Sequence, residues 1–170
     1  MKKGLFFTID GILAAGIVFA TIIFASSFYA EEQPTFHVSY MSKDLIDTLS
    51  VANVQKINNG YINSLISDNT ITNLDNTVLD QIVEFWAEND MEKAKKTASN
   101  VTAPLVPDTT GFSILIDGET IYSRDKPITK SLASSKKIIS GIAKGHQTGN
   151  TRNNPPTLFG PVIVEIRVWQ

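Results

Sequence analysis

The sequence predicts an α+β fold, in which a long N-terminal membrane-spanning α-helix precedes a small head of two or three helices and an antiparallel β-sheet. Three observations predict it. Residues 11–29 are apolar or small and carry no charge. Beyond them, apolar residues recur with a helical period to about residue 101, and after Pro107 they alternate with period two. Strands that follow helices, rather than alternating with them, favour an antiparallel sheet.

Composition limits the classes of function. The chain has 170 residues, of which 42% are hydrophobic and 19% charged, so it has room for one globular domain beyond the apolar segment. Without Lys2 and Lys3, 13 basic residues stand against 17 acidic ones, a balance of −4. No nucleic-acid partner is expected, because such partners attract concentrated Lys and Arg. The lack of cysteine excludes disulfides, thiolate nucleophiles and cysteine-based metal sites.

The run from Gly11 to Tyr29 approaches the roughly 20 residues with which a helix crosses about 30 Å of hydrocarbon. Basic residues precede the run and acidic residues follow it, so the positive-inside rule predicts a cytoplasmic N-terminus and a head outside. Asp10 is the exception, since a carboxylate at the centre of a membrane helix costs roughly 2.5 to 3.5 kcal/mol. Asp10 therefore has a charged partner, or it lies at the interface and reaches water.

Three interpretations of this segment are open. The first is an ordinary signal peptide cleaved near Ala25-Ser26-Ser27, which Asp10 disfavours because it would lie in the apolar h-region. The second is an uncleaved anchor that carries an outer domain binding a ligand or partner without polymerising. The third is a prepilin-type leader cut after Gly4.

The residues Lys2-Lys3-Gly4 followed by Leu5-Phe6-Phe7-Thr8-Ile9-Asp10 carry a resemblance. This N-terminus resembles that of archaeal type IV pilin-like proteins with class III signal peptides. The resemblance implies processing at Lys3, Gly4 and Leu5 by a prepilin-type membrane peptidase, which cuts after Gly4. It also implies that Phe6, Phe7, Ile9 and Asp10 act in subunit assembly, with Asp10 facing the terminal amine of a neighbouring subunit. In bacterial members the acid is a Glu at the fifth mature position, whereas Asp10 would be the sixth.

Elementary electrostatics agrees with that role for Asp10. A charge that is costly in an apolar setting becomes tolerable beside an opposite charge. Cleavage after Gly4 would create a free ammonium group on Leu5 and remove Lys2 and Lys3. Every copy of the chain would then carry both members of the pair.

The expected organisation is a basic leader (1–4), a transmembrane or filament-core helix (5–30) and an extracytoplasmic head (31–170). The resemblance implies a structural subunit or minor component of an extracellular type IV pilus-like filament. Its implied partners are the peptidase, other subunits, the assembly platform with its ATPase, and membrane lipid before assembly. The protein would move from the cell membrane to a filament at the cell surface.

In the head, Pro34 is expected to kink or end the first helix. A helix is predicted over 37–51, with Val38, Met41, Leu45 and Leu49 on one face. Residues 53–76 are predicted to be loop with one or two short apolar turns. Thr77 with Asp80, and then Asp90, are predicted to cap two helices, over about 78–86 and 91–102, with apolar inner faces.

The strands are predicted at 112–116, 120–123, 134–142 and 161–169, with Asp117-Gly118 as a two-residue hairpin turn. Residues 145–160 are predicted to be an exposed loop. The family resemblance adds the expectation that the apolar face of the sheet packs on the helix at 37–51.

No catalytic constellation is visible, and we expect no enzyme, cofactor or metal site. His37 and His146 are far apart, each without a neighbour at ligand spacing. Asp75, Asp80 and Glu84 could be metal ligands, but one-turn spacing is more typical of a solvated helix face. Ser134-Ser135-Lys136-Lys137 indicates a solvated strand edge rather than a Ser/Lys nucleophile pair. Asn100-Val101-Thr102 makes Asn100 a candidate glycosylation site.

Overall fold

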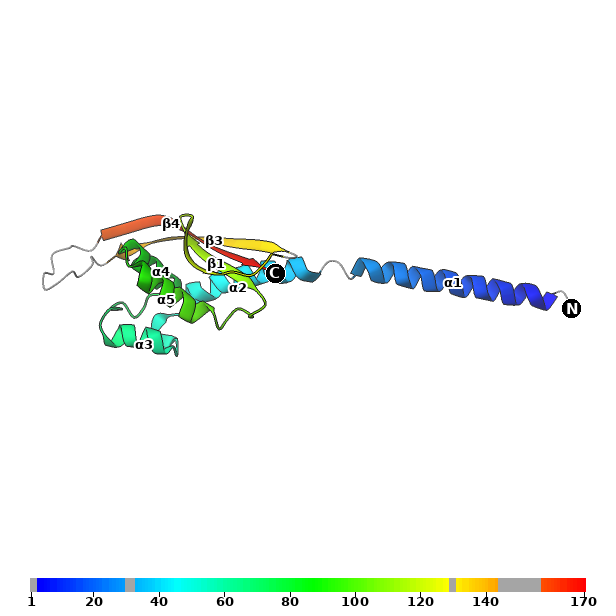
Figure 1. The fold of residues 1–170 in the computed structure, drawn as a ribbon, viewed down its shortest axis with the longest axis horizontal. Coiled ribbons are helices and arrows are strands. Elements are labelled where there is room, and N and C mark those ends of the chain that lie inside the picture. Colours follow the sequence, from blue (N-terminus) through cyan, green and yellow to red (C-terminus); the bar gives the residue numbers. More distant parts are fainter. Residues whose placement is uncertain (1–2, 30–32, 129–130, 144–156) are drawn as a thin grey trace.

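The computed structural model describes the backbone of residues 3–29, 33–128, 131–143 and 157–170, and the side chains of residues 11–25, 37–128, 131–143 and 157–170. A long helix stands apart at one end, and the other elements form the head (Figure 1). The elements in chain order are α1 (Lys3–Tyr29), α2 (Gln33–Val51), the 3-10 helix η1 (Val54–Lys56), α3 (Gly60–Ser67), α4 (Val78–Ala87), α5 (Met91–Thr102), β1 (Gly111–Ile116), β2 (Glu119–Arg124), β3 (Leu132–Ala143) and β4 (Thr157–Trp169).

The four strands form one antiparallel sheet in the order β2-β1-β4-β3. Strand β1 is an inner strand, because its Ile114 lies opposite Tyr122 on β2 and opposite Ile166 on β4. The last strand joins the centre of the sheet, so β4 separates the hairpin β1–β2 from β3. The predicted α+β class with an antiparallel sheet is therefore found in the head.

Helix α2 covers the inner face of the sheet and packs on β3 and β4 (Figure 1). Val38 and Leu49 on α2 are fully buried, as are Val164 and Ile166 on β4. They belong to one hydrophobic core that also takes in the inner faces of α4 and α5. The packing of the sheet on the helix at 37–51 is thus confirmed.

The predicted helix caps are present. Thr77 Oγ1 accepts from the backbone N–H of Asp80, whose carboxylate reaches back to the N–H of Thr77, so the pair forms a capping box at α4. The Asp90 side chain accepts from the N–H of Lys93 at the start of α5. Residues 53–76 contain more helix than expected, because Asn59 caps the eight-residue α3.

The predicted hairpin turn is also confirmed. Asp117 and Gly118 both have positive φ, 48° and 86°, as a two-residue turn of the primed type requires. Strand β4 begins at Thr157, earlier than predicted, because Thr157, Leu158 and Phe159 pair with the end of β3. The rest of the predicted loop, with His146, lies outside the described residues.

The predicted fold class is wrong in one element, the expected membrane-spanning helix. Over the residues that the structure describes, no helix is both long enough and apolar enough to cross a membrane.

Candidate assembly interface

The side chains of residues 11–25 in α1 are all exposed. The large ones are Ile12, Leu13, Ile17, Val18, Phe19, Ile22, Ile23 and Phe24, each between 57% and 72% exposed. In Figure 1 α1 stands clear of the sheet and of the head helices. Apolar side chains so open to water mark a surface that another surface covers.

The apolar character of α1 runs around the whole helix. Successive residues are about 100° apart around the helix axis, and the widest sector without a large apolar side chain spans about 100°. That sector holds only the small residues Ala14, Thr21 and Ala25. The Thr21 hydroxyl donates to the carbonyl of Val18 at 2.8 Å, so its polar group is already engaged within the helix. No side of this stretch is suited to water. A helix that is apolar all round is normally buried on every side.

The predicted processing and assembly residues lie in the first two turns of α1. Lys3, Gly4 and Leu5 form its start, and Asp10 follows five residues after Leu5. Helix geometry separates Leu5 and Asp10 by about 7.5 Å along the axis. The side chains of Phe6, Phe7, Ile9 and Asp10 lie outside the described residues, so their roles stay predictions.

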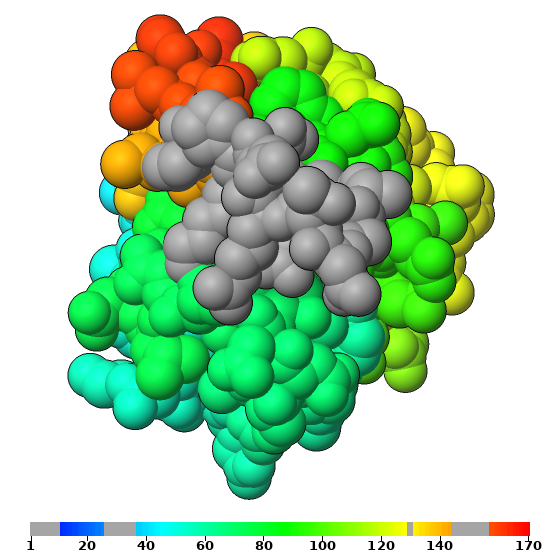
Figure 2. All heavy atoms as spheres, turned by 90° about the vertical axis from the view of Figure 1, so that its left-hand side faces the viewer, coloured from blue at the N-terminus to red at the C-terminus, as the bar shows by residue number. Residues whose placement is uncertain are grey.

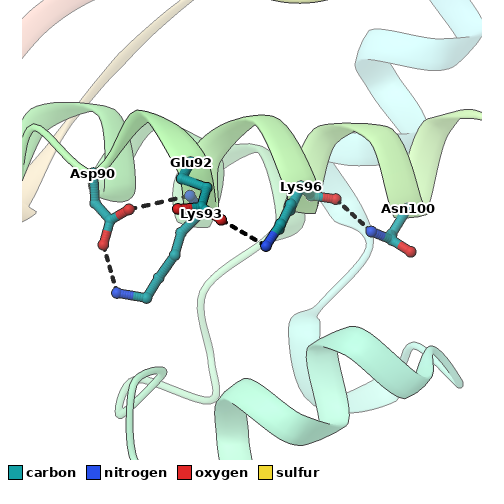
Figure 3. Close-up of polar contacts among 5 residues, drawn as sticks. All are labelled: Asp90, Glu92, Lys93, Lys96 and Asn100. Carbon is teal, nitrogen blue, oxygen red and sulfur yellow. Dashed lines mark hydrogen bonds and ion pairs between the residues drawn. The ribbon is translucent and has the colours of Figure 1, made fainter.

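Asn100, the candidate glycosylation site, lies on the exposed face of α5 that Figure 3 shows. Its Nδ2 donates to the carbonyl of Lys96 at 2.8 Å, and Lys96 pairs with Glu92 at 2.7 Å one turn earlier. Thr102, the third sequon residue, is fully buried and donates to the carbonyl of Ala98 at 2.6 Å. In the folded head, both polar side chains of the sequon are therefore engaged within the helix.

The considered metal ligands do not converge. Asp80 serves the cap of α4, and the buried Glu84 accepts from the Asn76 amide at 2.7 Å. The expectation of a solvated face is therefore wrong for Glu84. Within the described part of the chain, no group of three His, Asp or Glu side chains could hold a metal ion. His37 is exposed on α2.

The Ser/Lys stretch lies on β3, an outer strand of the sheet, as predicted. Ser135 Oγ lies 3.0 Å from Ser42 Oγ on α2, which ties the strand to the helix beneath it. Lys136 reaches the Glu165 carboxylate on β4 at 3.5 Å, while Lys137 is exposed. These contacts hold the strand in place and bring no base to a serine hydroxyl.

Sequence reasoning missed Arg124. Its guanidinium donates hydrogen bonds to the connection between α5 and β1. Its nitrogens donate to the carbonyls of Ala103, Val106, Pro107 and Thr110 at 2.6 to 3.4 Å. A weak signal was present, since Pro104 and Pro107 lack N–H groups and leave this connection rich in unmatched acceptors.

Comparison of the chain with protein-family models, with curated proteins and with solved structures finds no match.

Proposed function

We propose that this protein is a structural subunit or minor component of an extracellular type IV pilus-like filament, assembled through its N-terminal helix after prepilin-type processing. One observation supports the proposal most strongly. The stretch of α1 between residues 11 and 25 is uncharged and exposed around its full circumference, while the head has its own closed core. A part of this kind needs neighbours on every side.

Copies of the same helix supply such neighbours. Packing several α1 helices together buries all sides at once, whereas one flat partner would leave half of the side chains in water. Each fully buried Leu, Ile, Val or Phe contributes about 1.5 to 3 kcal/mol, so eight large apolar side chains provide a strong drive to associate. The heads would then lie outside the bundle.

Charge pairing supports the same arrangement. After cleavage at Gly4, each copy would carry an ammonium on Leu5 and a carboxylate on Asp10. A neighbour displaced along the axis by about 7.5 Å would bring these opposite charges together. The prepilin-type peptidase, the assembly platform and its ATPase are the partners that this route requires.

Asp10→Ala tests the proposal. We expect the variant to be cleaved normally but to give far fewer filaments, because the ammonium on Leu5 would be left without its counter-charge. Cleavage is read from the mass of the mature chain, and filament yield from the sheared cell-surface fraction and electron microscopy.

Asp68→Asn, which changes an exposed acid at the end of α3, is the matched control and should assemble normally. Wild-type filament yield from Asp10→Ala would show that Asp10 does not register the subunits. A Gly4→Leu variant should block cleavage itself, which separates the processing step from assembly.

A further inference from the structure

A hollow lies on the head between the α4–α5 corner, the start of β2 and the start of β4. Its volume is about 450 Å³, within the range of small-molecule sites. Figure 2 looks onto the end of the head opposite α1, where β4 begins in orange-red. None of the lining residues belongs to α1, so the hollow is separate from the candidate assembly interface.

Two aromatic side chains from different elements line the hollow. Trp86 comes from the last turn of α4, and Phe159 comes from the start of β4. Both are only partly buried, although each also packs on the core. The indole Nε1 of Trp86 donates to Glu119 Oε2 at 2.8 Å, which fixes the plane of the ring. A fixed aromatic face that is open to solvent can stack on a flat ligand.

Two polar groups stand beside these rings. Glu119 is exposed, and among the described residues the Trp86 indole is its one hydrogen-bond partner, which leaves carboxylate oxygen free to accept more. The side-chain amide of Asn89 makes no hydrogen bond to another described residue. Asn89 has φ of 61° at the turn between α4 and α5, which holds it at the rim of the hollow. The site thus offers donors and acceptors next to a stacking surface.

We propose that this hollow binds a neutral sugar ring. The C–H face of a pyranose packs on aromatic rings, and its hydroxyl groups both donate and accept hydrogen bonds. The Asn89 amide supplies donors and an acceptor, and the Glu119 carboxylate supplies acceptors. An organic ammonium would also bind to the aromatic rings and the carboxylate, but it has no acceptor for the N–H donors of the Asn89 amide. The combination therefore favours a polyhydroxyl ligand.

The test uses the full chain in detergent micelles and its two tryptophans, each with one indole N–H signal in a nitrogen–proton NMR spectrum. A Trp86→Phe variant assigns the signals. Glucose, galactose, mannose, N-acetylglucosamine and tetramethylammonium are titrated separately at millimolar concentration. We expect at least one sugar to shift the Trp86 signal saturably and to leave Trp169 unmoved, since Trp169 donates to the carbonyl of Lys126 away from the hollow.

Asn89→Gly removes the amide while keeping the backbone conformation, because glycine adopts positive φ readily. We expect it to weaken sugar binding by about fivefold or more. Asn69→Gly, at φ of 55° just after α3 and outside the lining of the hollow, is the matched control and should bind as wild type.

Three results would overturn the proposal: no shift with any of the four sugars, a shift with tetramethylammonium alone, or equal binding by Asn89→Gly and Asn69→Gly. Each result is obtained on unassembled chains. The sugar site can therefore fail while the filament proposal stands, and the reverse also holds.

Discussion

At the scale of single residues, Arg124 donates hydrogen bonds to a connection in which Pro104 and Pro107 have no N–H group. Its guanidinium lies 4.9 Å over the Phe112 ring, and the Arg124 side chain as a whole is 17% exposed. The planar fork reaches carbonyls on both sides of Pro107 at once, which a single ammonium group cannot do.

Arg124→Lys should therefore lower the free energy of unfolding by about 2 kcal/mol, because several charge-assisted hydrogen bonds to carbonyls are lost while the charge is kept. Guanidinium unfolding of the full chain, followed by circular dichroism, measures the change. Lys137→Ala removes an exposed cation from β3 and should leave the midpoint where it is. Equal midpoints for both variants would refute this role of Arg124.

A second residue-scale feature is the acid at the centre of β4. Hydrogen bonding from Arg167 lowers the pKa of Glu165, Lys136 adds to the effect, and partial burial opposes it. A carboxyl whose pKa is lower in the folded chain stabilises the fold above its unfolded pKa, and this contribution is lost as the pH falls through the folded pKa.

Stability of the wild type should accordingly decline as the pH falls below about 4.5, and Glu165→Gln should remove part of that decline. Thermal unfolding midpoints at a series of pH values between 7 and 3 give the comparison. Identical pH profiles for both proteins would mean that this acid has the same pKa in the folded and unfolded chain.

At the scale of elements, the local signals in the sequence were informative wherever they were complete within a few residues. The capping box at Thr77, the cap at Asp90 and the turn at Asp117-Gly118 each depend on short-range geometry and were predicted correctly. The start of β4 was not, since Thr157, Leu158 and Phe159 form strand by pairing with β3. The order of strands likewise depends on distant partners.

Thr77→Ala should cost about 1 kcal/mol of stability, because the first turn of α4 loses the acceptor for the Asp80 N–H. Thr109→Ala, at an exposed position in the connection before β1, is the matched control. Hydrogen exchange adds a local readout, with faster exchange expected at the start of α4 alone. Uniform acceleration across the sheet would contradict a capping role.

At the scale of the whole molecule, the chain consists of a head with a closed core and a helix that the head does not cover. The individual helices and strands of the head could be predicted from periodicity, because burial on one side imposes a repeat on each helix and strand. Arg124 and the hollow at Trp86 could not, since they join residues that are far apart in sequence and share no spacing.

The predicted membrane span illustrates another limit of sequence reasoning. A run of uncharged residues shows that α1 avoids water, and it does not show what covers the helix. Residues 11–25 are apolar on all sides, which is equally typical of a helix inside a bundle. In the proposed filament other copies of the chain would cover α1, and such a contact would form only between chains.

The mass of the mature chain, taken from the cell-surface fraction, tests the central claim most directly. We expect a chain that begins at Leu5, without Met1 to Gly4, recovered in particles far larger than one copy. A chain that still begins at Met1 and is recovered as single copies would contradict it.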